Sequence, residues 1–546
     1  MEKEFEEFQS DSERIAKELA SALNLPYFNL QFFRPEIEAL DKVPIDWAKK
    51  TKSIPIKINN KDILLGVVDP YNQNFKDLKE DLEKKGFKVK TAIISDESFQ
   101  TGLNEYNFLP DKKISYLSIF EINSEILNYI KNKVNTKEEL SLSLSQLSLS
   151  DPFLILDYVF GGAIKFDSSD IHFEPYEDKV FVRFRIDGIL YDIFSFPLNI
   201  YPLLKNRIKI LSGMKINVYN KPQDGRFSLN YEGQKIDIRV SSVPSTKDES
   251  IVCRILKLSS VAVELESLGL REDDLKILNQ AIYSPNGLIL NTGPTGSGKT
   301  TTLYSVLIKI KKPELKILTI EDPVEYKIEG ISQSQVNEES GFTFSNALRS
   351  FLRHDPDIIL VGEIRDKETA QIAVQASLTG HLVLSTLHTN DALGAIPRLI
   401  SLGVDPQLIP PALRLVIAQR LLRKICPYCA IEYTPGDDLR EKIKNNLKNL
   451  PSRVNLKDID LNNFSLLKPK GCQKCLGLGY KGRLAIFELL SINKKLESII
   501  EKNPSEAEIY EAVSDNFVSL QQDGLIKALF KITSIEEVER VTGLIN

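Results

Sequence analysis

The 546-residue sequence has no apolar run of about 18 residues, the length at which a helix could cross a membrane. It has no excess of positive charge either, because 75 acidic residues outnumber 70 Lys and Arg. The resulting net charge of −5 disfavours a broad basic face for nucleic acid. Residues 1–7 are acidic where a secretory signal would be basic and then apolar. We therefore expect a cytoplasmic protein that meets a membrane only through partners.

Cysteine is scarce, with five in the chain. Cys253 lies alone in an apolar, strand-like run and is expected to pack as a small hydrophobic side chain. The other four form two Cys-x-x-Cys pairs: Cys426, Cys429, Cys472 and Cys475. Two such pairs can complete a structural zinc site with four thiolate ligands. Redox dithiols or disulfides are the alternative, which a reducing cytoplasm disfavours.

The octapeptide GPTGSGKT at 293–300 is the most informative segment. An apolar stretch at 287–290 precedes it, and 301–307 has the pattern of a helix start. A strand, a Gly-rich turn and a helix in this order direct backbone N–H groups at phosphate oxygens. Lys299 is expected to reach the β- and γ-phosphates of ATP, and the Thr300 hydroxyl to ligate Mg²⁺. The predicted ATP-binding residues are Gly293, Pro294, Thr295, Gly296, Ser297, Gly298, Lys299, Thr300 and Thr301.

The length and the patterns predict several domains. In the range 267–425 strands and helices alternate, which is typical of a parallel sheet with its ligand at the strand carboxyl ends. The serine-rich stretch 141–150 alternates like a strand, but such repeats between domains are more often mobile linkers. The predicted divisions are a small α/β domain at 1–108, a flexible linker at 109–150, a second α/β domain at 151–266, the ATPase core at 267–425, a cysteine region at 426–482 and a helical region at 483–546.

A strand is predicted at 179–186, ending at the hairpin turn Asp187-Gly188. Alternation places Arg183 and Arg185 on one face of this strand. Two arginines on one face fit a solvated surface. They also fit a pair of cations that is delivered to an anion across an interface.

Acidic residues follow the strand predicted at 317–320. Glu321, Asp322 and Glu325 would be brought to the end of this strand, beside the expected nucleotide. A general base or a water-positioning group must lie in that place.

Two further predicted strands end in polar residues. The apolar run 358–361 precedes Glu363, in a Walker B arrangement where most P-loop proteins have Asp. The longer side chain fits a role in holding the hydration shell of Mg²⁺. The strand at 382–387 ends at His388, which could sense the γ-phosphate.

Together these motifs resemble the secretion-ATPase superfamily, in the branch that powers type II secretion and type IV pilus assembly. The Cys-x-x-Cys pairs resemble the tetracysteine insertion of its assembly and secretion members, which retraction-type relatives lack. The other segments that carry the resemblance are 169–175, 183–188, 222–226, 321–325, 362–366, 387–390, 419–421 and 479–483.

The resemblance implies a RecA-like P-loop core preceded by a PAS-like domain and a small N-terminal α/β domain, with a zinc-binding tetracysteine insertion. It implies a homo-hexamer in which the PAS-like domain of one subunit closes over the nucleotide of a motor domain. ATP, Mg²⁺ and Zn²⁺ are the implied cofactors. An inner-membrane platform protein and an adaptor at the N-terminal domain are the implied partners, with no nucleic acid.

Residue roles follow from the same resemblance. It implies Glu325 as the catalytic carboxylate, Glu363 as the acid for Mg²⁺ and water, and His388 as a phosphate sensor. Arg183, together with Arg185, would be an interface arginine that stabilises the transition state.

Two other functions stay open at this point: a DNA-translocating ATPase and a nucleotide-binding switch or scaffold. The acidic composition counts against the first. The presence of water-activating acids counts against the second, because a switch does not require them. The sequence does not distinguish pilus assembly, secretion and DNA uptake.

Overall fold

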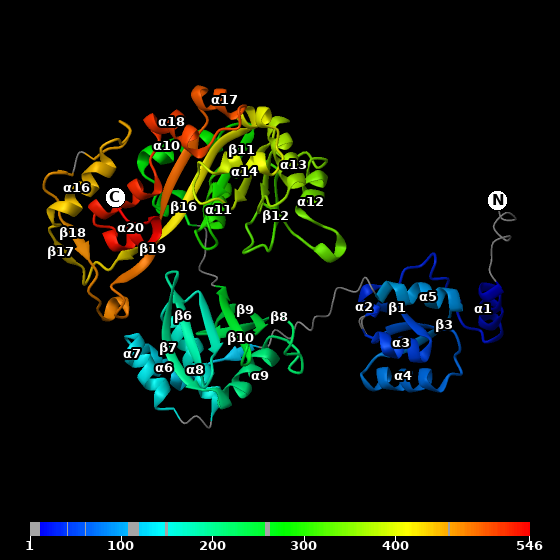
Figure 1. Ribbon diagram of the computed structural model, residues 1–546. Helices are drawn as coiled ribbons and strands as arrows, with labels where there is room; N and C mark the ends of the chain where they lie inside the picture. The colour runs from blue at the N-terminus through cyan, green and yellow to red at the C-terminus, as the bar shows by residue number, and fades with distance from the viewer. Residues whose placement is uncertain are drawn as a thin grey trace. The chain divides into compact units, whose positions relative to one another are not determined.

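The computed structural model describes residues 11–40, 42–59, 62–106, 119–147, 151–256, 263–456 and 459–545. The chain forms two compact units, Met1–Leu117 and Ser118–Asn546. Figure 1 shows the elements of each unit. None of the helices in the described ranges combines the length and apolar character that crossing a membrane requires.

The first unit is a small α/β domain, as predicted. Its sheet has the order β1-β2-β3, with β1 and β2 antiparallel and β2 and β3 parallel. The strands are β1 Ser53–Asn59, β2 Asp62–Val67 and β3 Lys88–Ile93, and the helices are α1 Asp11–Ala22, α2 Ile37–Leu40, α3 Ile45–Thr51, α4 Gln73–Lys84 and α5 Asp96–Glu105.

Part of the predicted flexible linker at 109–150 is helical, so the prediction is wrong there. Helices α6 Ser124–Lys133 and α7 Lys137–Ser145 belong to the second unit. Leu140 and Leu144 are fully buried in its core. Their four-residue spacing puts both on one helix face, a periodicity that the serine alternation obscured. Residues 109–118 and 148–150 of the predicted linker lie outside the described residues.

The PAS-like region of the second unit is built on a sheet with the order β4-β8-β9-β10-β5-β6-β7. The strands are β4 Ile119–Glu121, β5 Asp170–Pro175, β6 Lys179–Ile186, β7 Ile189–Pro197, β8 Gln223–Tyr231, β9 Gln234–Pro244 and β10 Glu249–Leu256, with helices α8 Pro152–Lys165 and α9 Tyr201–Leu211. The predicted hairpin is present, because β6 and β7 pair on either side of Asp187-Gly188. Val182, Phe184 and Cys253 are fully buried in the core of this region.

The motor region has a second seven-stranded sheet, of order β13-β12-β14-β15-β11-β16-β19. All of its pairs are parallel except β16 with β19. The strands are β11 Gly287–Thr292, β12 Ile317–Glu321, β13 Ser332–Gln335, β14 Ile358–Val361, β15 Leu382–Leu387, β16 Leu413–Ile425 and β19 Tyr480–Ser491. The helices are α10 Glu272–Ile282, α11 Lys299–Ile310, α12 Phe344–Phe351, α13 Lys367–Leu378, α14 Ala395–Ser401 and α15 Ile409–Ala412.

The C-terminal part departs from the predicted helical region at 483–546. That region begins with most of β19, which pairs with β16 and extends the motor sheet. Residues 484–490 of this strand are all buried. The remaining elements are β17 Ile431–Tyr433, β18 Leu466–Lys468, α16 Asp437–Leu447, α17 Lys494–Ile500, α18 Glu506–Val513, α19 Leu520–Leu529 and α20 Ile535–Thr542.

Candidate functional site

The P-loop connects a buried strand to a helix, as its flanks predict. Every residue of β11 is buried, and α11 begins at Lys299. Gly296 and Gly298 have φ values of 78° and 89°, in the left-handed region that favours glycine. A Cβ at Gly298 would come within 2.8 Å of Gln419 Nε2. The loop therefore needs glycine at these positions, so that its backbone N–H groups can point toward a bound phosphate at the start of the helix.

Lys299 lies along this loop. Its Nζ donates hydrogen bonds to the carbonyl oxygens of Gly293, at 2.6 Å, and Pro294, at 3.1 Å. Burial lowers its pKa, and the nearby Arg420 acts in the same direction, whereas Glu363 raises it. A partly buried lysine with this balance of charges is suited to bind an anion such as phosphate.

Glu363 and His388 come together at the carboxyl edge of the sheet. They follow β14 and β15, which are neighbouring parallel strands, and β15 also pairs with β11. His388 Nε2 lies 3.2 Å from Glu363 Oε2, and Arg365 forms an ion pair with the other oxygen of Glu363. The Glu363 side chain is mostly buried, whereas half of the His388 side chain is exposed. The sequence placed each residue after a predicted strand, and the parallel order of β14 and β15 brings the two side chains together.

The acidic residues at the end of β12 and just after it differ in burial. Glu321 is buried and accepts hydrogen bonds from the hydroxyls of Tyr304 and Thr319, so it holds the structure together. Asp322 and Glu325 are exposed. Glu325 is thus an accessible acid, and its carboxylate lies 4.0 Å from Arg239 Nη1.

Arg183 and Arg185 share one face of β6, as predicted, and each is paired within its own sheet. Arg183 donates to Asp192 at 2.7 Å and to Glu174 at 3.2 Å. Arg185 Nε lies 3.5 Å from Asp170. These ion pairs restrict the arginine side chains before any partner arrives.

Sequence reasoning missed three arginines that lie in the same cross-strand row as Arg185. Arg226 faces Arg239, and Arg239 faces Arg254 on the next strand. Arg254 in turn faces Asp170, which faces Arg185. Residues directly opposite in antiparallel strands point to the same face. Only the strand register creates this row, although alternation within β9 would have placed Arg239 on a definite face.

The four cysteines of the two pairs converge, although Cys426/Cys429 and Cys472/Cys475 are far apart in sequence. Their Sγ atoms all lie within 4.8 Å of one another. Three of the separations are 3.7 to 3.9 Å, close to the ~3.8 Å between sulfurs that share a tetrahedral zinc. They are too long for disulfides, and the donor set fits a four-thiolate metal site. Such a site leaves no open position for catalysis.

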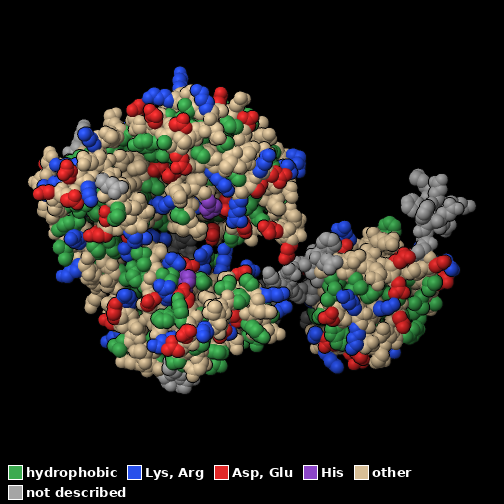
Figure 2. All heavy atoms as spheres, in the orientation of Figure 1, with side chains coloured by type: hydrophobic (Ala, Val, Ile, Leu, Met, Phe, Trp, Pro, Cys, Tyr) green, Lys and Arg blue, Asp and Glu red, His purple; other side chains and the backbone are tan. Residues whose placement is uncertain are grey.

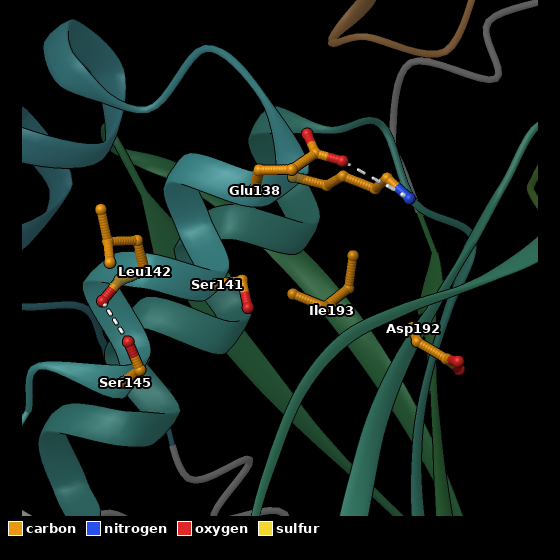
Figure 3. A pocket seen from close by; sticks show the side chains of 7 residues that line it. Glu138, Ser141, Leu142, Ser145, Asp192 and Ile193 are labelled. Atoms are coloured by element: carbon orange, nitrogen blue, oxygen red, sulfur yellow. Dashed lines mark hydrogen bonds and ion pairs between the residues drawn. The ribbon is translucent and has the colours of Figure 1, made fainter.

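A groove of about 350 Å³ lies in the PAS-like region, away from the P-loop (Figure 3). Its walls come from α7, with Ser141 and Ser145, and from β7, with Asp192 and Ile193. Asp192 is the residue that holds Arg183. The groove therefore lies next to β6, the strand that carries Arg183 and Arg185. It contributes no residue to the candidate nucleotide site.

Comparison with known proteins identifies the family. A family model described as "Type II/IV secretion system protein" matches residues 152–540. This chain belongs to that family. A second model, "MshEN domain", matches residues 23–110. The secretion-family model thus spans the PAS-like and motor regions, and the MshEN model covers most of the N-terminal domain.

Type II secretion system protein E of Dickeya dadantii is 46% identical to this secretion-family chain over 380 residues, 70% of this chain and 73% of that protein. Type IV pilus assembly ATPase PilB of Myxococcus xanthus is 35% identical over 531 residues, 97% of this chain and 91% of that protein. The structure of the ATPase DotB of Legionella pneumophila has a TM-score of 0.50 and 21% identity, covering 71% of this chain and 95% of that chain. DotB is similar in fold only. Family membership confirms the predicted fold class and the enzyme class, an ATPase.

Proposed function

We propose that this secretion-family ATPase is a hexameric motor that converts ATP hydrolysis into movement of an inner-membrane platform protein. The movement would drive type IV pilus assembly or extension of a type II secretion pseudopilus. The observation that carries the proposal is the convergence of Lys299, Glu363 and His388 on the P-loop edge of the parallel sheet. A nucleotide bound there has its phosphates beside a cation, an acid and an imidazole.

The residues of this edge have distinct roles in the proposal. The P-loop, residues 293–301, binds the phosphates of ATP, and Lys299 neutralises the charge of the transferred group. Thr300 and Glu363 would hold Mg²⁺, which would offset the negative charge of the phosphates. Glu325 orients the attacking water and accepts its proton. His388 senses the γ-phosphate through its contact with Glu363.

The arginine face of the PAS-like region supplies the second half of the site in this proposal. Arg183 and Arg185 would approach a nucleotide at the interface with another subunit. A ring is the arrangement in which every motor region meets such a face. An adaptor at the N-terminal domain would link the ring to the membrane.

The alternative functions have less support from the molecule. Among the described residues, Figure 2 shows Lys and Arg side chains intermingled with Asp and Glu over the face in view. A DNA translocase would be expected to gather its cations along a track. A nucleotide switch would not need the exposed acid Glu325 beside the phosphates.

Replacing Glu325 by glutamine is the experiment that tests the proposed function. We expect ATP turnover to fall about 10²-fold or more, because the amide cannot accept the proton of the attacking water. Nucleotide affinity should be retained, since the P-loop is unchanged. Phosphate release and titration with a fluorescent ATP analogue measure the two quantities.

Glu329→Gln is the matched control, because Glu329 is exposed on the same segment and lies outside the proposed site. Its turnover should equal that of the unmodified protein. Normal turnover in Glu325→Gln would refute the assigned role of Glu325.

We also propose that the four cysteines hold one structural zinc ion. Replacing Cys472 by serine should reduce bound zinc from one ion per chain to a small fraction of that. The melting temperature should fall by about 5 °C, the shift that corresponds to a loss of about 2 kcal/mol in a domain of this size. Metal analysis and thermal unfolding check both outcomes.

Cys253→Ala is the control for the zinc measurement. Cys253 is fully buried but belongs to the core of the PAS-like region, so this variant should keep its zinc although it loses stability. Full zinc content in Cys472→Ser would exclude the four-thiolate site.

A further inference from the structure

A hydrogen-bonded cluster connects the P-loop helix to the segment that bears Glu325. Tyr304 lies on α11, which begins at the P-loop lysine, and it is fully buried. Its hydroxyl donates to Glu321, the last residue of β12. Burial and this hydrogen bond raise the pKa of Tyr304. Tyr304 therefore stays protonated, and its hydroxyl bonds to Glu321.

Glu321 is the centre of the cluster. Besides Tyr304, its carboxylate accepts hydrogen bonds from Thr319 Oγ1, at 2.6 Å, and from Gln333 Nε2, at 3.3 Å. These three donors come from α11, β12 and β13. A buried carboxylate is costly unless donors surround it. The hydrogen bonds to Glu321 therefore join β12 to α11 and β13.

Gln333 extends the cluster beyond Glu325 in the chain. Its Nε2 donates to the carbonyl oxygen of Tyr326 at 3.1 Å, and its Oε1 accepts from the backbone N–H of Ile328 at 2.7 Å. The Tyr326 ring meets the Tyr304 ring edge to face, with centroids 4.7 Å apart. The segment that carries Glu325 is thus held by hydrogen bonds both before and after this residue.

We propose that Tyr304, Glu321 and Gln333 are positioning residues, which hold the Glu325 carboxylate in line with the phosphates bound by the P-loop. The inference rests on the proposed function, because it assumes that Glu325 acts on the attacking water. Tyr304 lies on α11, the helix that begins with Lys299 and Thr300. A shift of this helix would therefore be transmitted through hydrogen bonds to the segment that carries Glu325. None of the three residues touches the reacting atoms, and their effect is on geometry.

The Tyr304→Phe variant tests the proposal in the full chain, because it keeps the ring and removes the hydroxyl. We expect kcat to fall about 10-fold to 100-fold, the range associated with a displaced catalytic group. KM and the affinity for a fluorescent ATP analogue should change little, since the P-loop itself is unaltered. A loss of general stability would not produce this separation of kcat from KM.

Tyr201→Phe is the matched control. Tyr201 is equally buried, and its hydroxyl donates to the carbonyl oxygen of Glu249 at 2.8 Å in the PAS-like region. Both variants should lower the melting temperature by a similar amount, and Tyr201→Phe should leave kcat unchanged. An equal loss of kcat in both variants, or an unchanged kcat in Tyr304→Phe, would overturn the proposal.

A double-mutant cycle separates positioning through Glu321 from any independent effect of Tyr304. In the Glu321→Gln background, the additional Tyr304→Phe change should have little further effect on kcat, because both act through the same contact. Effects that multiply would show that Tyr304 does not act through Glu321, and this would overturn the proposal. The Glu325→Gln variant distinguishes the two hypotheses. If Glu325→Gln loses turnover while Tyr304→Phe keeps normal turnover, only the positioning role is refuted. If Glu325→Gln itself turns over normally, the assigned role of Glu325 is refuted.

Discussion

Replacing Lys299 by alanine is expected to remove measurable ATP turnover, with a loss of about 10³-fold or more. The ammonium group lies along the P-loop, bonded to the carbonyl oxygens of Gly293 and Pro294, and close to Glu363. Without it, the β- and γ-phosphates lose their nearest cation at a partly buried site, where water compensates poorly. Nucleotide affinity should fall together with turnover, which separates this variant from Glu325→Gln.

Lys312→Ala is the control for the lysine, since Lys312 is exposed and follows the end of α11. It should bind and hydrolyse ATP as the unmodified protein does. Titration of a fluorescent ATP analogue and a phosphate-release assay give the two readouts. Retained turnover in Lys299→Ala would remove the basis for assigning a P-loop role to this segment.

Replacing Arg183 by alanine is expected to lower turnover by about 10³-fold, the lower end of the effect of interface arginines in related phosphoryl transfers. Asp192 and Glu174 hold its guanidinium in place, so the cation is oriented before the interface closes. The oligomeric state should be unchanged, as measured by light scattering. Lys179→Ala is the control, because Lys179 is a cation on the same face of β6, at its exposed start.

A mixing experiment tests whether Arg183 acts on another subunit. Glu325→Gln protein retains its arginine, and Arg183→Ala protein retains its acid. If the arginine acts in trans, about one in four interfaces of a randomly mixed ring pairs an intact acid with an intact arginine. Turnover of the mixture should then clearly exceed the sum of the two variants alone. A mixture no more active than that sum would contradict a site shared between subunits.

The candidate nucleotide site was predictable because its chemistry is local. Phosphate binding needs glycines and a lysine in one continuous turn between a strand and a helix, and residues 293–300 carry all of it in order. The acids and the histidine were also predictable, since each lies at or within a few residues of the end of a predicted strand. In a parallel sheet such strands place their ends at one edge, and Glu363 and His388 do meet there.

Other features depended on contacts between segments far apart in the chain. Leu140 and Leu144 become helical core residues because they pack against a sheet formed much later in the sequence. Glu321, at the end of β12, and Glu325, four residues later, cannot be told apart by residue type. The side chains of Tyr304 and Gln333 donate hydrogen bonds to the carboxylate of Glu321, which is buried, whereas Glu325 is exposed.

The sequence by itself determined the phosphate-binding loop, the alternation that puts Arg183 and Arg185 on one face, and the four thiols able to bind a metal. Each of these depends on residue type and short spacing. Tertiary structure alone decided which acid is accessible, which arginines align with Arg185, and that the two cysteine pairs meet. Strand register and side-chain burial are set by packing over the whole domain, and a one-residue shift in pairing would change every one of these contacts.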